Sequence, residues 1–237
     1  MTLPKHMHVG IAIFVKTPGH SPLKTRLAAG IGVDAARQFH LLAANAVAAV
    51  ARHAQRDMPL VTPHWAVAET AALDDPAWAS LPRIDQGEGD LGARMCHVTE
   101  HLLTHYDAAL LLGADTAQIT AADIAAAAHA LQANQHAIGP SIDGGFWLFA
   151  TRGNVPAAAW STTPWSQANT AARFCDALLG DALLSNALSD ASVARLRSLR
   201  DADITDDLLP LLRDLDALDA PLPEQQRLAE WLRAKLR

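Results

Sequence analysis

The sequence predicts one α/β domain with a largely parallel central sheet. It has 237 residues, of which 50% are hydrophobic and 19% charged, enough to bury an ordinary globular core. Short apolar runs alternate with longer alanine-rich stretches, which is the pattern of βα units. No internal repeat or low-complexity linker divides the chain, so we expect a single domain over residues 1–237.

Each element follows from its own residue pattern. The strands are short apolar runs, the weakest of them interrupted by Pro63, and the helices carry apolar residues every three or four positions. Asp90 and Thr120 should cap two helices, because a side-chain oxygen can bond the free amides of a first turn. In chain order we expect a strand over 9–15, a helix over 33–56, a strand over 60–67, a helix over 90–106, a strand over 108–113, a helix over 121–131, strands over 137–142 and 146–150, a helix over 168–179, a strand over 194–199 and a closing helix over 223–236.

Charge and cysteine content exclude several classes of protein. The 19 basic and 25 acidic side chains give a net charge of −6, which argues against nucleic acid as a partner. No apolar run approaches the ~20 residues that span a bilayer, and the run over 9–15 is too short for a signal peptide. Cys96 and Cys175 form no CxxC pair, so we expect a protein of the reducing cytoplasm with neither a disulfide framework nor a cysteine-rich zinc site.

Three conspicuous segments directly follow predicted strands. They are the loop after Val15, Asp115 just beyond Gly113, and the turn Asp143-Gly144-Gly145. Ligands of open α/β sheets bind beyond the carboxyl ends of the strands. We therefore expect these segments to meet at one functional site.

The loop after Val15 contains three cations, Lys16, Lys24 and Arg26. Backbone amides shaped by glycine and proline, together with these side chains, could bind phosphate oxygens. The loop has neither the GxxxxGK[ST] nor the GxGxxG spacing, so those two nucleotide-binding families are disfavoured. The alternative interpretation is an ordinary solvated loop.

A second segment, residues 87–94, is rich in glycine and precedes a predicted helix. Gly89 and Gly92 would allow close approach of a ligand to the backbone, and Arg94 would lie near the start of the helix. The alternative is a well-capped connection between a strand and a helix.

Several aspartates are candidates for metal or substrate binding. Asp115 could hold a hard divalent cation, which would stabilise a diphosphate or pyrophosphate leaving group. Asp201 and Asp203 are alternate residues after a predicted strand, so they should point to one side and suit a second pair of metal oxygens. Asp143 would contact a substrate. The alternatives are a turn aspartate for Asp115 and a hairpin turn for Asp143.

Histidine and tryptophan side chains form two further sets of candidate ligand-binding residues. His97, His101 and His105 form a stripe on one predicted helix, but eight residues rise ~12 Å, so all three cannot bind one ion. We expect this stripe to face solvent or to be structural. Trp147 and Trp165 are candidate platforms for stacking a base or a sugar.

Six motifs occur in the same order as in one known group of proteins. In these motifs the chain resembles the bacterial glycosyltransferase-like branch of the nucleotide-diphospho-sugar transferase (GT-A) superfamily. It is similar to the guanylyltransferases that make phospholactate-derived and molybdenum cofactors. The resemblance covers about residues 8–210 and rests on Phe14-Val-Lys-Thr-Pro…Lys24-Thr-Arg-Leu27, Gly87-Glu-Gly-Asp-Leu-Gly-Ala-Arg-Met95, Gly113-Ala-Asp115, Gly139-Pro-Ser-Ile-Asp-Gly-Gly145, Pro164-Trp-Ser166 and Arg200-Asp-Ala-Asp203…Asp207-Leu208.

The resemblance implies a Rossmann-like GT-A domain with helices on both faces of its mostly parallel sheet, and with a nucleotide half and an acceptor half. It implies that residues 16–26 and 87–94 wrap the nucleotide, and that Asp115, Asp201 and Asp203 bind the metal. It also implies that Gly144, Gly145 and Trp165 lie on the acceptor side. Two departures are Pro18-Gly-His-Ser-Pro22, where many relatives have Pro-x-Pro-Gly, and Ala117, where many have proline.

These observations lead to one leading hypothesis. We expect a cytoplasmic transferase, dependent on Mg²⁺ or Mn²⁺, that uses a nucleotide-activated donor, foremost an NDP-sugar, and a small-molecule acceptor. Lys16, Lys24 and Arg26 would hold the phosphates, and Asp143 would orient or deprotonate an acceptor hydroxyl.

Two alternatives remain open. The first is a nucleotidyltransferase that joins an NTP to a phosphorylated acceptor and releases pyrophosphate. The second is a non-catalytic nucleotide-binding module, which the displaced loop glycine and Ala117 favour.

Overall fold

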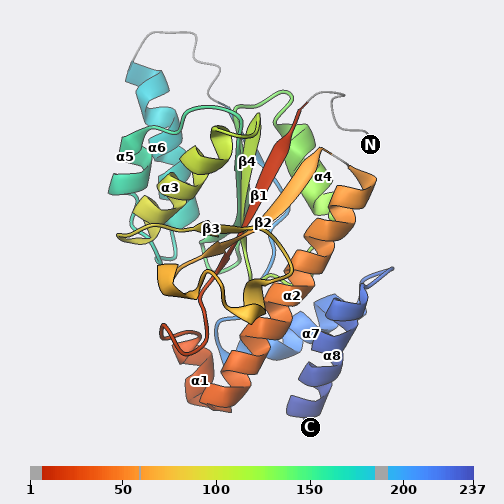
Figure 1. The fold of residues 1–237 in the computed structure, drawn as a ribbon. Helices are drawn as coiled ribbons and strands as arrows, with labels where there is room; N and C mark the ends of the chain where they lie inside the picture. The colour runs from red at the N-terminus through yellow and green to blue at the C-terminus, as the bar shows by residue number, and fades with distance from the viewer. Residues whose placement is uncertain (1–6, 59, 185–191) are drawn as a thin grey trace.

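The computed structural model describes residues 7–58, 60–184 and 192–237 (Figure 1). Three short 3₁₀ turns occur at Thr70–Ala72, Pro76–Trp78 and Thr205–Asp207. The helices and strands, in chain order, are β1 (Val9–Val15), α1 (Thr25–Ile31), α2 (Val33–Asp57), β2 (Val61–Val67), β3 (Arg83–Asp85), α3 (Leu91–Leu103), β4 (Ala108–Gly113), α4 (Ala121–Ala130), β5 (His136–Pro140), β6 (Phe146–Thr151), α5 (Ala157–Thr162), α6 (Thr170–Leu184), β7 (Val193–Arg195), α7 (Leu208–Asp216) and α8 (Pro223–Lys235).

The described strands form one mixed, mostly parallel sheet. Their order across the sheet is β3-β2-β1-β4-β6-β5-β7. Strand β6 runs antiparallel to both of its neighbours, β4 and β5, and every other pairing is parallel. The carboxyl ends of β1, β4, β5 and β7 therefore share one edge with the start of β6. The predicted α/β class with a mostly parallel sheet is confirmed.

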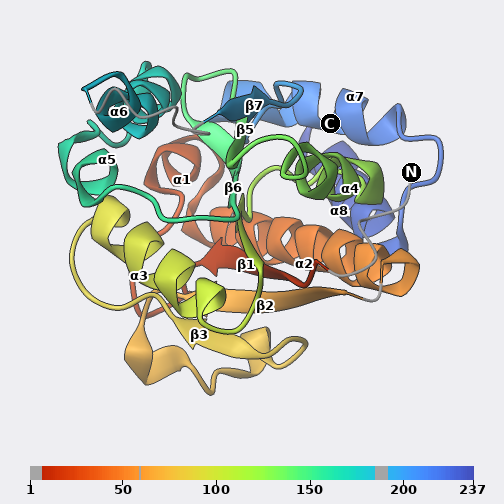
Figure 2. The same cartoon turned by 90° about the horizontal axis from the view of Figure 1, so that it is seen from above.

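Helices cover both faces of this sheet (Figures 1 and 2). Buried alternate residues of β1, such as Ile11 and Ile13, belong to the core beneath α2 and α4, whereas Ala12 belongs to the core beneath α3, α5 and α6. This two-sided burial explains why β1 reads as a continuous apolar run. A third core, with Phe39 at its centre, packs α7 and α8 against α2.

Most predicted elements are confirmed with small changes in their bounds. The strands over 9–15 and 108–113 have the predicted limits, and α2 and α8 end within one residue of theirs. Helix α3 stops three residues early, α6 runs from Thr170 to Leu184, and the strand expected over 194–199 is only Val193–Arg195, followed by an isolated bridge between Ser141 and Leu199. The short elements α1, β3 and α5 were not predicted, because three to seven residues are too few to show a period.

The two predicted helix caps differ in their chemistry. The Asp90 carboxylate accepts a hydrogen bond from the Ala93 amide at 2.9 Å, as expected. Thr120 is the N-cap of α4, as predicted, and it forms a capping box with Asp123 in the first turn. Both the amide and the hydroxyl of Thr120 donate to Oδ2 of Asp123.

Candidate functional site

Two cavities adjoin one another at the carboxyl edge of the sheet. Their volumes are about 340 and 310 Å³, the lower end of the range for small-molecule sites. The basic cavity is lined by Lys16, Lys24 and Arg26, and the acidic cavity by Asp143 and Asp201. Their shared wall consists of Phe14, Leu91, Ala114 and Asp115.

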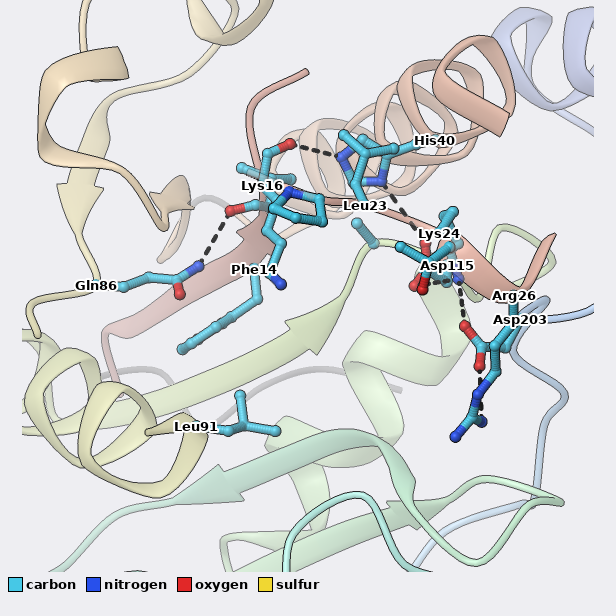
Figure 3. Close-up of a pocket in the computed structure, with 14 residues that line it drawn as sticks. Phe14, Lys16, Leu23, Lys24, Arg26, His40, Gln86, Leu91, Asp115 and Asp203 are labelled. Carbon is cyan, nitrogen blue, oxygen red and sulfur yellow. Dashed lines mark hydrogen bonds and ion pairs between the residues drawn. The ribbon is translucent and has the colours of Figure 1, made fainter. Parts of the chain in front are cut away.

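The ammonium group of Lys24 is fully engaged by protein oxygens. Its Nζ lies 2.7 Å from Oδ2 of Asp115, 2.6 Å from the carbonyl oxygen of Ala202 and 3.5 Å from Oδ1 of Asp203. The side chain is only 6% exposed. Burial alone would lower the pKa of Lys24, but the surrounding carboxylates outweigh it and raise that pKa above its usual value. Lys24 is therefore a buried cation that ties the loop after β1 to the turn after β4 (Figure 3).

Asp115 has one engaged and one free carboxylate oxygen. Its Oδ1 is buried and accepts no hydrogen bond, and Nδ1 of His40 lies 3.9 Å from it. Burial opposes ionisation of Asp115, but Lys24 and His40 outweigh it and hold its pKa below the usual range. The Nε2 of His40 donates to the carbonyl oxygen of Lys16, because a carbonyl can only accept (Figure 3). Asp115 is therefore ionised and retains one buried oxygen without a hydrogen-bonding partner.

Lys16 and Arg26 differ from Lys24 in their exposure. Arg26 is 73% exposed, and its Nη1 lies 3.2 Å from Oδ2 of Asp203, an ion pair at the rim of the basic cavity. Lys16 lines the same cavity from the end of β1 and is also exposed. These two side chains can turn toward an anion in the cavity, because little protein structure depends on their position.

The acidic cavity contains carboxylates on two different turns. Asp143 lies on the turn between β5 and β6, where its Oδ1 accepts a hydrogen bond from the Gly145 amide at 2.9 Å. Burial, with the nearby charges of Asp143 and Asp115, raises the pKa of Asp201 to about 6. Asp201 also lines this cavity, so three carboxylates approach one another here.

The turn that carries Asp143 requires glycine. Gly144 has a φ of 93°, and a Cβ atom on it would lie 1.8 Å from the carbonyl oxygen of Ala168. The carbonyl oxygen of Gly144 accepts a hydrogen bond from the amide of Ala171 at the start of α6. The hairpin interpretation of this turn is thus confirmed, and it places Asp143 at the cavity as well.

Aromatic side chains form much of the remaining wall of the acidic cavity. Phe146, Trp147 and Trp165 line it, and Phe146 packs edge-on against Trp165. The indole N–H groups of Trp147 and Trp165 both donate to backbone carbonyls, at 3.1 and 3.0 Å. These two side chains therefore present only apolar surface to the cavity.

Backbone strain coincides with both cavities. Among the described residues, only Lys24 (φ 46°) and Ser166 (φ 60°) are non-glycine residues in the left-handed region. Lys24 lines the basic cavity and Ser166 the acidic one. Such strain persists where the surrounding structure fixes the backbone, and it concentrates at functional sites.

The glycine-rich segment, residues 87–94, contributes one residue, Leu91, to the walls of both cavities. Gly92 instead packs α3 against α5, since a Cβ atom on it would lie 2.4 Å from the carbonyl oxygen of Trp160. Arg94 donates to the carbonyl oxygens of Gly89 and Ala68 and so braces its own loop. None of Gly89, Gly92 and Arg94 is among the described residues that line the cavities, so the interpretation as a strand-to-helix connection fits their placement better.

The carboxylates differ in how well they suit a divalent cation. Both oxygens of Asp203 face cations, Oδ1 toward Lys24 and Oδ2 toward Arg26, so it is a poor ligand in this arrangement. Asp115, with its free oxygen, and Asp201, partly buried beside it, are the better fit. No three potential ligands within the described ranges form a metal centre of their own. Mg²⁺ is commonly held by one or two carboxylates plus substrate phosphates, and Asp115 with Asp201 matches that requirement.

Some residues of the site were not predicted from sequence. His40 and Gln86 line the basic cavity, and both are buried, at 5% and 4% exposure. The Gln86 side chain donates to the carbonyl oxygens of Val15 and Ala66 (Figure 3). His40 lies on the buried face of an alanine-rich helix, and this polar residue among apolar ones was the signal that could have revealed it.

Two further expectations concern the rest of the molecule. The three histidines of the α3 stripe are all exposed, which confirms the solvent-facing interpretation. Within the described part of the chain, no helix is both long and apolar enough to cross a membrane.

Comparisons with known proteins agree with this architecture. The family described as "Uncharacterized protein conserved in bacteria (DUF2064)" matches residues 31–167, and no curated protein matches the chain. Among solved structures, the chain is similar to a protein of Desulfovibrio desulfuricans described as a "putative nucleotide-diphospho-sugar transferase". The TM-score is 0.79 at 21% identity, over 97% of this chain and 99% of that one. This likeness confirms the predicted GT-A-like fold.

Two weaker structural likenesses have TM-scores of 0.49. One is to 4-diphosphocytidyl-2C-methyl-D-erythritol synthase of Anaerococcus prevotii, at 9% identity over 89% of this chain and 96% of that one. The other is to glucosyl-3-phosphoglycerate synthase of Mycobacterium tuberculosis in complex with Mn²⁺, UDP and phosphoglyceric acid, at 10% identity over 97% of this chain and 78% of that one.

Proposed function

This chain belongs to the DUF2064 family, conserved in bacteria, and we propose that it is a transferase that uses a nucleotide-activated donor and a divalent cation. The donor class that the site supports best is an NDP-sugar, so that the reaction is glycosyl transfer to a hydroxyl group. One observation carries the proposal: a basic and an acidic cavity adjoin at Asp115, at the edge of the sheet where ligands of such folds bind.

In this proposal the basic cavity binds the diphosphate of the donor. Lys16 and Arg26, which are exposed, contact its oxygens directly. Lys24 does not bind the phosphates directly in this proposal, because its Nζ already contacts three protein oxygens. Its role is to hold Asp115 ionised and in place, next to the position where negative charge grows on the leaving diphosphate.

Asp115 and Asp201 would hold the cation, Mg²⁺ or Mn²⁺. When bound, the cation supplies a positive charge that stabilises the leaving diphosphate. Asp143, on the far wall of the acidic cavity, faces the acceptor and is placed to accept the proton of its hydroxyl.

Calorimetric titration with nucleoside diphosphates tests the donor assignment. With Mg²⁺ present, we expect at least one of UDP, GDP, CDP and ADP to bind, and chelation of Mg²⁺ with EDTA to weaken that binding about tenfold or more. In Asp115→Asn the ratio of the two affinities should fall to about one. The matched control is Asp34→Asn, a change at the exposed start of α2, which should preserve the ratio. Equal Mg²⁺ dependence in Asp115→Asn and the wild type would refute the assignment.

Product analysis separates the two chemistries that share this site. Glycosyl transfer releases a nucleoside diphosphate from an NDP-sugar, and nucleotidyl transfer releases pyrophosphate from an NTP. We expect the first product. A chain that binds no nucleotide under any of these conditions would instead be a module without this activity.

A further inference from the structure

The charged side chains of the two cavities are sharply divided. All described cationic side chains of the site line the basic cavity, whereas the charged residues that line the acidic cavity are Asp115, Asp143 and Asp201. The cation Lys24 contacts Asp115 at the boundary of the acidic cavity, but its Nζ is already occupied by Asp115, Asp203 and the carbonyl oxygen of Ala202. In the absence of a divalent cation at Asp115 and Asp201, a phosphate or carboxylate entering the acidic cavity would thus meet carboxylates and find no free cation on the described wall.

The rest of this wall is apolar and aromatic. Phe146 and Trp165 are partly exposed, and they line the cavity together with Leu91 and the buried Met95. The indole N–H of Trp165 is already bonded to the carbonyl of Trp160, so the ring offers no donor to a charged group. Apolar faces of sugars and aromatic rings pack well on such surfaces.

Neutral polar groups lie at one side of the same cavity. The Ser166 and Gln167 side chains line it, and both residues are exposed. Hydroxyl and amide groups recognise uncharged hydroxyl-bearing ligands without demanding a charge on them.

We propose that the acceptor of this enzyme is an uncharged, hydroxyl-bearing small molecule with an apolar or aromatic face, which packs on Phe146 and Trp165 with its hydroxyl toward Asp143. This inference rests on the proposed function, because it takes the acidic cavity as the acceptor site.

A matched pair of probes tests the inference. 4-Nitrophenyl β-D-glucoside and 4-nitrophenyl β-D-glucuronide differ only at C6, where the second has a carboxylate. Equilibrium dialysis at low salt and in EDTA, so that no divalent cation offsets the charge of Asp115 and Asp201, should give a dissociation constant at least about tenfold lower for the glucoside, because the carboxylates of the wall repel the glucuronide. Equal binding of the two probes, tighter binding of the glucuronide, or no binding of the glucoside up to its solubility would overturn the proposal.

One substitution locates the effect in the acidic cavity. Gln167→Lys adds a cation at an exposed position on its wall and should reduce the preference for the glucoside about tenfold. Gln132→Lys, the same change at an exposed position just after α4, should leave the preference unchanged. An identical response to both lysines would mean that the probes bind elsewhere and would overturn the proposal.

The two proposals fail in different experiments. Loss of the glucoside preference with intact Mg²⁺-dependent nucleotide binding would refute only the acceptor inference. The opposite result is that no nucleotide binds, while the glucoside is still preferred over the glucuronide and Gln167→Lys still reduces that preference. This result would refute the donor assignment and leave the acidic cavity as a site for an uncharged ligand.

Discussion

The Nζ of Lys24 lies 2.7 Å from Oδ2 of Asp115, and the lysine side chain is almost entirely enclosed by the protein. Lys24 belongs to the loop after β1, and Asp115 to the turn after the neighbouring strand β4. This ion pair fixes the relative position of the two loops and forms part of the boundary between the two cavities.

Breaking this pair should destabilise the protein. Lys24→Met leaves Oδ2 of Asp115 without its cation, so we expect the free energy of unfolding to fall on the order of 3 kcal/mol in urea titrations. Arg37→Ala removes an exposed ion pair with Asp34 and should change it by less than about 0.5 kcal/mol.

The double variant Lys24→Met/Asp115→Asn checks the same interaction. Because the two residues are in contact, the cost of the double change should be less than the sum of the single costs. Additive costs would show that the pair contributes nothing beyond its separate residues.

Arg26 should matter for ligand binding and not for stability. It is exposed and its ion pair with Asp203 lies at the cavity rim, so Arg26→Ala should leave the urea midpoint unchanged. A charge-assisted hydrogen bond contributes about 1.5–3 kcal/mol, so the affinity for a nucleoside diphosphate should fall about tenfold or more in calorimetry. Arg227→Ala, an exposed arginine on α8, serves as the control. Unaltered affinity in Arg26→Ala would remove this residue from the phosphate site.

Replacing each of two helix glycines by alanine should change the stability of the protein in opposite directions. Gly92→Ala places a methyl group against the carbonyl of Trp160 and should cost about 1–3 kcal/mol of stability. Gly180→Ala, in α6, meets no atom within 4 Å among the described residues and should be stabilising by about 0.5–1 kcal/mol, because alanine favours the helix. Thermal unfolding of both variants checks the pair, and destabilisation by both to the same degree would contradict the packing role of Gly92.

His136 should make stability depend on pH. Its burial lowers its pKa to about 4 from an ordinary 6.5, and it is only 1% exposed. The Thr151 hydroxyl donates to the carbonyl of Gly153, so the Nδ1–H of neutral His136 is the donor to Thr151. The unfolded chain takes up a proton first as pH falls. Stability is therefore full above about pH 6.5 and decreases toward pH 4, by about 3 kcal/mol in all.

Urea titrations between pH 7 and pH 4 measure this effect. His136→Gln should flatten the dependence, whereas His129→Gln, at an exposed position on α4, should retain it. An unchanged pH dependence in His136→Gln would assign the loss to other groups.

Long helices and strands were predicted accurately from the sequence, whereas the shortest elements were not. The pattern of β1, β4 and α2 extends over enough residues for its period to be unmistakable, and their bounds agree closely with the structure. Strand β3 has three residues and exists because β2 supplies its hydrogen-bonding partner, which no local pattern reveals. The hydrogen bonds of the Thr120 cap likewise depend on a partner outside the capping residue, the carboxylate of Asp123 three residues further on.

The candidate site was predictable in its location and less so in the roles of its residues. Segments after β1, β4 and β5 do meet, because the topology brings the ends of these strands to one edge. Lys24 was expected to hold phosphates, yet its hydrogens point at protein oxygens. Gly92 was expected near the nucleotide, yet it packs against Trp160. Both differences depend on partners far away in the chain.

The order of apolar runs and turn residues by itself determined the α/β class, the principal strands and the edge at which polar residues gather, since these depend on short-range periodicity and on general rules of chain connection. Only the tertiary structure decided which charged side chains lie next to one another. The division into a basic and an acidic cavity depends on side chains from separate strands coming within a few ångströms, and a linear pattern does not record those distances.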